Sequence, residues 1–266
     1  MQEISSLKNA KVKLLTQLSK KSSMRKKHGV FLIEGIKEIK KALKNGFEVK
    51  HIYFNPEIIN KQWMSEIKKK HPHIEWIKVS KQVYEKIAYR DSTGGILALA
   101  KMKDHKLSNL KPTDNPLILI AEKIEKPGNI GAMLRTADGA GMDAVILVSP
   151  VTDLYNPNVI RSSLGTVFSN SIAIVNDLEE LKNFLKKNDI QLYIATLQNA
   201  NPYYKEDYSI PSAIAVGAED KGLSEDFRKL ENKAIYIPMK GDADSLNVSV
   251  SAAILSYEAL RQRDLQ

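Results

Sequence analysis

The chain has 266 residues, a net charge of +9 and no cysteine. This length suffices for one large or two ordinary domains, each with its own core. The composition excludes disulfides, thiol nucleophiles and cysteine zinc sites, and no run of about eighteen apolar residues could span a membrane. Because the N-terminal residues also lack an apolar secretory segment, we expect a cytoplasmic protein with no membrane partner.

The charge is distributed unevenly along the chain. Residues 1–115 contain 25 Lys and Arg against 11 Asp and Glu, whereas residues 116–266 contain 15 against 20, so the two parts carry +14 and −5. Between Ile4 and Ile33 there are eight basic residues and no acidic one. Such a cluster is either a solvated helix surface or a face that binds a polyanion. The candidate contacts are Lys11, Lys13, Arg25 and Lys26.

The first hundred residues read as a small α/β domain. A helix is predicted over residues 9–19, followed by the strand FLIEG and a helix over residues 36–45 that ends at Gly46. The strands HIYF and IEWIKV, a helix over residues 63–70 and the apolar run GGILALA come next. Residues 103–116, KDHKLSNLKPTDNP, are polar and contain two prolines, which is typical of a linker. We therefore expect domains at residues 1–102 and 117–266.

From residue 117 onward, apolar strands alternate with helices. The predicted strands are LILIA, AVILVS, SIAIV, QLYIAT, AIAVG and AIYIP, and the predicted helices lie near residues 129–140, 157–163, 177–188, 224–231 and 246–263. Near-continuous apolar strands in this alternation indicate a parallel sheet that is covered by helices on both faces.

Two short patterns suggest ligands that the context does not support. GAGMDA, residues 139–144, fits one form of the dinucleotide fingerprint G-x-G-x-x-A, which requires a strand before it and a helix after it. Here a helix precedes it, Gly141 takes the C-terminal cap position and a strand follows, so we do not expect NAD. His71 and His73 come without further ligands, and we expect no metal site.

Three loops follow predicted strands, where open α/β sheets bind their ligands. Loop 1 contains EKIEKPGNIG (residues 122–131), loop 2 is VGAEDKGLS (residues 216–224), and loop 3 is IPMKGDADSLNVSVS (residues 237–251). Their glycines permit close backbone approach, while Ser224 and Ser245 also suit helix N-caps. No P-loop pattern occurs, so a nucleoside triphosphate is not expected.

In this order, the three loops resemble the signature motifs of the SpoU/TrmH branch of the SPOUT RNA methyltransferases. The matches are N-x-G-x-x-x-R-T-A at residues 129–137, G-x-E-x-x-G-L at residues 217–223, and I-P-M-x-G…S-L-N-V-S-V-S-A at residues 237–252. The likeness covers residues 117–266. ISSLKNAKVK, RKKHGVFLIEG and GGILALA also resemble the ribosomal-protein-like α/β substrate-binding domain that many members carry.

The resemblance implies a parallel sheet that ends in a deep trefoil knot, and transfer of a methyl group from S-adenosylmethionine to a ribose 2′-hydroxyl of rRNA or tRNA. It implies a homodimer through the knotted region, in which the partner chain completes the site. Backbone at Gly217, Ile237 and Leu246 would hold the cofactor, and Met239 would line the adenine pocket. Arg161, in RSSLGTVF, matches a segment near the dimer and RNA surface and is a further candidate phosphate contact.

The resemblance places Asn129, Arg135, Glu219, Ser245 and Asn247 in the catalytic site. All five histidines precede residue 106, so the second domain contains neither histidine nor cysteine as a base. This leaves a carboxylate such as Glu219, or an arrangement around Arg135, to deal with the hydroxyl proton. Because the guanidinium pKa is very high, orientation and phosphate clamping suit Arg135 better than proton abstraction.

Several alternatives remain open in the sequence. Arg135 also fits an ordinary helix surface, and Glu219 also fits a loop carboxylate without a catalytic role. Lys126 and the pair Asp220–Lys221 depart from many relatives, which leaves the exact RNA substrate open. A non-catalytic RNA-binding protein that retained the fold is the alternative function, although Asn129 and Arg135 are both present.

Overall fold

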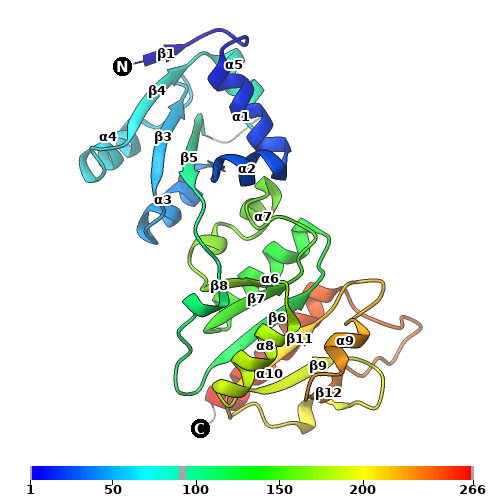
Figure 1. Cartoon of the computed structure of the whole chain (residues 1–266). Helices are drawn as coiled ribbons and strands as arrows, with labels where there is room; N and C mark the ends of the chain where they lie inside the picture. Colours follow the sequence, from blue (N-terminus) through cyan, green and yellow to red (C-terminus); the bar gives the residue numbers. More distant parts are fainter. Residues whose placement is uncertain (1, 90–93, 265–266) are drawn as a thin grey trace. The chain divides into compact units, whose positions relative to one another are not determined.

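The computed structural model describes residues 2–89 and 94–264. Its contacts divide the chain into two units (Figure 1). The first unit contains residues 1–103 and 153–169, and the second contains residues 104–152 and 170–266. Residues 153–169 therefore belong by their contacts to the first unit, although in chain order they lie between strands of the second.

The first unit is built on a mixed five-stranded sheet with the order β1-β4-β3-β5-β2. Its strands are β1 (Gln2–Ile4), β2 (Val30–Glu34), β3 (Val49–Phe54), β4 (Glu75–Val79) and β5 (Ile96–Lys101). Its helices are α1 (Ala10–Lys20), α2 (Ser22–His28), α3 (Ile36–Lys44), α4 (Lys61–Lys70), α5 (Lys81–Ile87) and α7 (Pro157–Ser162). The small α/β architecture predicted from the sequence is confirmed, and β1, α2 and α5 are additional elements.

Apolar periodicity explains how the helices of this unit are placed. Leu15 and Leu18 of α1 and Val83 and Ile87 of α5 are fully buried and share one core with the sheet. Asn9 begins α1 by accepting a hydrogen bond from the Lys11 N–H at 2.8 Å. Helix α2 is too polar for its sequence to predict a buried face, and it ends at Gly29, which has φ of +63°.

Residues 153–169 complete the core of the first unit. The ring of Tyr155 stacks on Phe31 with centroids 4.0 Å apart, and Phe168 meets Phe47 edge to face at 5.0 Å. Burial raises the pKa of the Tyr155 hydroxyl; the hydrogen bond from the Lys103 N–H opposes this shift, and the charge of Asp153 adds to it. Phe31 belongs to β2, and Phe47 lies just before β3. This part of the core of the first unit therefore depends on Tyr155 and Phe168, which are distant in sequence.

The second unit contains a seven-stranded sheet with the order β10-β12-β9-β11-β6-β7-β8. All its neighbouring strands are parallel, as predicted. The strands are β6 (Leu117–Glu122), β7 (Ala144–Val148), β8 (Ile172–Val175), β9 (Gln191–Ala195), β10 (Asn201–Pro202), β11 (Ser212–Val216) and β12 (Lys233–Tyr236).

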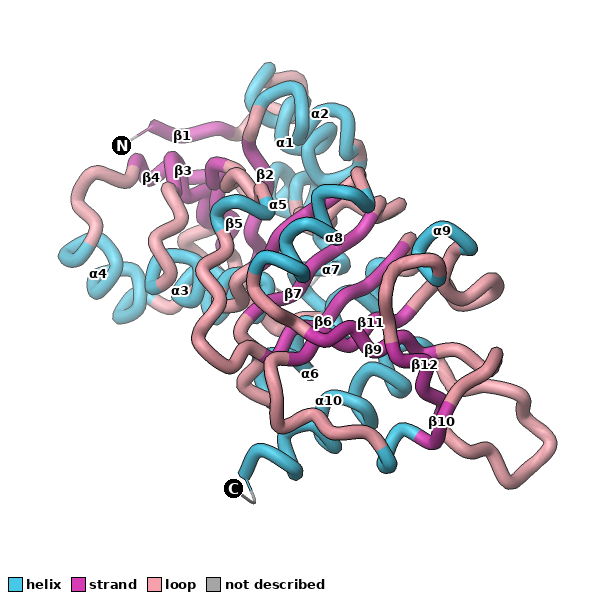
Figure 2. The backbone as a smooth tube through the Cα atoms, turned by 60° about the horizontal axis from the view of Figure 1, so that its bottom comes forward, coloured by secondary structure: helices cyan, strands magenta, loops and turns pink. Residues whose placement is uncertain are grey.

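Helices cover both faces of this sheet. They are α6 (Pro127–Gly139), α8 (Leu178–Lys187), α9 (Glu225–Arg228) and α10 (Val248–Asp264). Figure 2 shows α8 and α9 on one face, and α6 and α10 on the other. The helix predicted over residues 224–231 is reduced to one turn, α9. Within residues 103–116, Leu107 is buried in the core of the second unit, and the His105 carbonyl accepts a hydrogen bond from the Ile174 N–H.

The strand order changes direction beside β6. From β6 the chain proceeds to β7 and β8 on one side, whereas β11 pairs with β6 on the other. The chain therefore leaves the adjacent strands β6 and β11 toward opposite sides of the sheet. Open α/β sheets bind their ligands at such a point. Within the described residues, no helix has the length and apolarity needed to cross a bilayer.

Candidate active site

Loops 2 and 3 enclose a pocket of about 410 Å³ at the carboxyl edge of the seven-stranded sheet. Its lining includes all four residues predicted to hold the cofactor: Gly217, Ile237, Met239 and Leu246. The ends of β9, β11 and β12 supply the base of the pocket. The volume is in the range of ordinary small-molecule sites, so the structure places these four residues around one ligand-sized space.

Gly217 allows loop 2 to fold back tightly on itself. Ala218 and Gly222 exchange backbone hydrogen bonds of 3.1 and 2.8 Å, which closes a narrow turn. A Cβ atom at Gly217 would come within 2.2 Å of both the Gly222 carbonyl carbon and the Leu223 nitrogen. Any side chain at this position would therefore push the loop open and reshape the pocket wall.

The opposite wall of the pocket combines apolar side chains with backbone N–H groups. Ile237, Met239 and Leu246 are half-buried. Across residues 2–89 and 94–264, none of their backbone N–H groups has a hydrogen-bond acceptor. Such donors, set among apolar side chains, fit a flat heterocycle whose ring nitrogens accept hydrogen bonds.

A polar network connects the three loops. Glu219 of loop 2 accepts hydrogen bonds from the Asn129 side-chain amide and the Lys126 ammonium, one on each carboxylate oxygen. The Asn247 amide of loop 3 donates to the Asn129 Oδ1 at 3.4 Å. The hydrogen bond with Glu219, and secondarily its charge, raises the pKa of Lys126. Three of the five predicted catalytic residues therefore meet in this network.

Glu122 is a functional candidate that sequence reasoning missed. It ends β6, is 2% exposed, and accepts hydrogen bonds from both the N–H and the hydroxyl of Ser224. Ser224 in turn caps α9 by accepting from the Phe227 N–H at 3.3 Å, so its predicted N-cap role is confirmed. Glu122 thus fixes the far end of loop 2, while Glu219 fixes its middle.

Arg135 and Ser245 lie outside this network. Arg135 is exposed on α6. It follows Asn129 by six residues, which corresponds to about 9 Å along the helix axis. In the described part of the chain, its guanidinium makes no hydrogen bond or ion pair. Ser245 lines the pocket. The first turn of α10 is capped by Asn247, whose Oδ1 accepts from the Ser249 N–H at 2.9 Å, so the N-cap expected of Ser245 belongs to Asn247.

The predicted RNA contacts of the first unit fall into two groups. Lys11 is half-buried, and Lys13, Lys26 and Arg161 are exposed. Arg25 is only 2% exposed: its Nε donates to Asp153 at 2.5 Å and its Nη1 to the Leu18 carbonyl at 2.6 Å. A guanidinium held in this way cannot reach a phosphate, so the expectation that Arg25 contacts RNA is corrected by its burial.

Among the described residues, no group of three or more His, Cys, Asp or Glu side chains could hold a metal ion. His71 and His73 have ring centroids 6.0 Å apart, at the end of α4 and just after it.

Comparison with known proteins yields matches to both parts of the chain. The model of the SpoU rRNA Methylase family matches residues 116–257, and that of the MRM3-like substrate binding domain matches residues 9–98. The 23S rRNA (guanosine(2553)-2′-O)-methyltransferase RlmP of Bacillus subtilis is 32% identical over 97% of this chain and 98% of its own length.

Two solved structures are similar over nearly the whole chain. The structure of an RNA 2′-O ribose methyltransferase is 38% identical, with a TM-score of 0.83, and the match covers 98% of this chain and 99% of that one. The structure of an AdoMet-bound rRNA methyltransferase from Sinorhizobium meliloti is 27% identical, with a TM-score of 0.88, over 98% and 97% of the two chains.

Proposed function

Because this chain belongs to the SpoU rRNA methylase family, we propose that 23S rRNA is the RNA on which it acts. The chain is an S-adenosylmethionine-dependent RNA methyltransferase that modifies a ribose 2′-hydroxyl. The choice of 23S rRNA is supported by the Bacillus subtilis relative, which matches both units over nearly its full length. A tRNA substrate is the alternative.

The pocket of loops 2 and 3 is the single observation that carries this function. S-adenosylmethionine supplies an electrophilic methyl group when bound. Its adenine ring suits the apolar side chains of Ile237, Met239 and Leu246 and their backbone N–H groups, which have no acceptor within the part of the chain that the structure describes. Gly217 leaves the pocket wall free of a side chain. These residues fit the cofactor, and GAGMDA, which leads from α6 into β7, lacks the strand-to-helix order that binds the pyrophosphate of NAD.

We assign the polar network a positioning role. Both oxygens of Glu219 accept hydrogen bonds, so its carboxylate acts in holding Asn129 and Lys126 rather than in removing a proton. Asn129 and Asn247 would orient the ribose, and Ser245 would shape the loop 3 wall. Arg135 would clamp an RNA phosphate or orient the 2′-hydroxyl, whose proton passes to water or phosphate. Correct alignment of the hydroxyl oxygen with the methyl group is by itself able to accelerate such a transfer.

The first unit is proposed to recruit RNA. The exposed charges of Lys13 and Lys26, together with half-buried Lys11, lie on α1 and α2 and suit the phosphates of structured RNA. We retain residues 1–102 as the RNA-binding domain, 103–116 as the linker and 117–266 as the methyltransferase domain. The segment 153–169, with Arg161, is then a methyltransferase-domain insertion that serves the RNA-binding unit.

A homodimer through α10 is also proposed. Val250 and Tyr257 are 45% and 50% exposed, lie about two turns apart on α10 and flank half-buried Ile254. The opposite side of α10 is buried, so this helix is apolar on both sides, as expected when its outer side also meets a partner. The trefoil knot and the cytoplasmic location remain proposals based on family resemblance and on the RNA substrate.

Mapping 2′-O-methyl groups in total cellular RNA, with and without the gene, tests the function. We expect one 23S rRNA position to lose its methyl group and to regain it with the wild-type gene. The Arg135→Ala gene should fail to restore it. Loss of a tRNA methyl group would refute the rRNA assignment, and an unchanged methylation map would refute the enzyme activity.

A further inference from the structure

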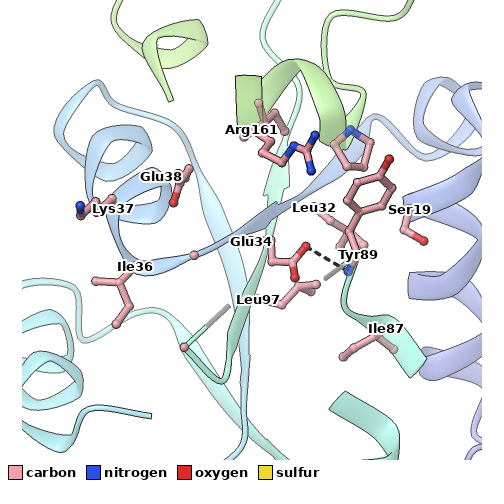
Figure 3. A pocket seen from close by; sticks show the side chains of 14 residues that line it. Ser19, Leu32, Glu34, Ile36, Lys37, Glu38, Ile87, Tyr89, Leu97 and Arg161 are labelled. Carbon is pink, nitrogen blue, oxygen red and sulfur yellow. Dashed lines mark hydrogen bonds between the residues drawn. The ribbon is translucent and has the colours of Figure 1, made fainter. Parts of the chain in front are cut away.

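Two pockets, one in each unit, differ in the charges of their linings. The pocket of the first unit lies beside β2, α3 and α7, and its charged side chains are of both signs: Lys37 and Arg161 with Glu34 and Glu38 (Figure 3). Such a mixture favours neither an anion nor a cation. The cofactor pocket of the second unit is different, because one end of it carries a guanidinium, that of Arg228.

Arg228 ends the short helix α9 and is half-buried in the wall of the cofactor pocket. Across residues 2–89 and 94–264, its guanidinium makes no ion pair. The acidic residues of the same helix, Glu225 and Asp226, lie instead 3.6 and 3.2 Å from the Lys229 ammonium. Because a half-buried charge is stabilised by a counter-ion, Arg228 favours a ligand with an anionic group.

Two neighbours of Arg228 offer further hydrogen-bond donors. The Arg228 Nη1 donates to the Gln198 Oε1 at 3.1 Å, so the amide oxygen is engaged and the Gln198 Nε2 remains as a donor. The Thr196 Oγ1 accepts the Gln198 N–H at 3.3 Å, and its own proton remains for another acceptor. Thr196, Gln198 and Arg228 all line the pocket, and we call them the donor cluster.

The charges of S-adenosylmethionine match this arrangement. Its sulfonium and α-ammonium groups are positive, and its carboxylate is negative. Asp220 of loop 2 and Asp244 of loop 3 line the same pocket and suit the positive groups. The donor cluster suits the carboxylate, since a guanidinium can hold both carboxylate oxygens through parallel hydrogen bonds.

We propose that the donor cluster binds the carboxylate in the methionine part of S-adenosylmethionine, with Arg228 as its central residue. This assignment rests on the cofactor pocket of the proposed function and not on the choice of RNA. The carboxylate takes no part in methyl transfer. Arg228 therefore determines how tightly the cofactor binds, and how well it is distinguished from adenosine derivatives that lack the carboxylate.

Calorimetry of the full chain with S-adenosylmethionine and with its decarboxylated form tests this assignment, because the two ligands differ only in the carboxylate. The wild-type protein should bind S-adenosylmethionine about tenfold more tightly, since charge-assisted hydrogen bonds are lost with the carboxylate. Arg228→Met should weaken binding of S-adenosylmethionine about tenfold and change binding of the decarboxylated form by less than about twofold. The preference for the carboxylate should thus disappear.

Lys187→Met is the matched control, because Lys187 is exposed on α8 and lies outside the lining of the pocket. It removes the same charge from the second unit and should keep the preference. Retained binding of the decarboxylated ligand shows that the Arg228→Met pocket is folded. If that variant does not fold, Gln198→Leu, at an exposed position, should reduce the preference several-fold.

The carboxylate site would be overturned by an Arg228→Met protein that still prefers S-adenosylmethionine. It would also be overturned if Lys221→Met abolished the preference while Arg228→Met did not, since Lys221 is an exposed cation of the same lining. Failure of the wild-type protein to bind either ligand would refute the cofactor pocket itself. The two failures are therefore distinguished by the wild-type titrations.

Discussion

Arg25→Met should destabilise the protein strongly, because it leaves the Asp153 carboxylate buried without its partner. The two side chains are 2% and 6% exposed, and the Nε–Oδ2 distance is 2.5 Å. Removing one member of such a buried pair costs about 3–5 kcal/mol. For a domain of this size, that loss corresponds to a fall in Tm of about 10 °C or more, measured by calorimetry or circular dichroism.

A double-mutant cycle with Asp153→Leu isolates the pair. The double variant should be less destabilised than the sum of the single variants, because neither charge is then left buried alone. Lys26→Met is the matched control, since Lys26 is the exposed neighbour on α2 and should change stability by less than about 0.5 kcal/mol. An Arg25→Met protein as stable as wild type, but with weakened RNA binding, would refute the structural role and return Arg25 to the RNA surface.

Three further variants test the sites. Glu122→Gln should weaken S-adenosylmethionine binding about tenfold in calorimetry, because one hydrogen bond to Ser224 is lost. Glu125→Gln is the control, since Glu125 is exposed in the same loop. Equal affinities of the two variants for the cofactor would contradict the role of Glu122. Arg135→Ala should lower turnover about 10² or more at unchanged cofactor affinity, whereas activity within a few-fold of wild type would place Arg135 on an ordinary helix surface. Neutralising Lys11, Lys13 and Lys26 together should flatten the salt dependence of RNA binding by up to about three phosphate contacts, and an unchanged slope would leave them as solubilising residues.

The strands of the second unit were predictable because each is a short, continuous apolar run. The strand order was not, since it places β11 beside β6, almost a hundred residues earlier in the chain. Local sequence contains no signal for such a pairing. The three motif loops could be located, because a loop after a parallel strand always opens at the same edge of the sheet.

The wrong prediction for Arg25 and the omission of Glu122 share one cause. Arg25 stands among lysines and Glu122 begins the charged run EKIEK, so both resemble surface residues. Each is buried by a partner more than a hundred residues away, Asp153 for Arg25 and Ser224 for Glu122. The local sequence gives the neighbours of a residue along the chain, whereas its burial depends on its neighbours in the folded structure.

The contribution of residues 153–169 to the first unit has a consequence for protein engineering. A chimera that exchanges residues 1–103 with those of a relative would set foreign side chains against Tyr155 and Phe168, which pack on Phe31 and Phe47. The first 103 residues expressed alone would expose those same aromatic faces to water. Transplanting the RNA-recruiting role proposed for the first unit therefore requires two separate stretches of the gene to be moved together.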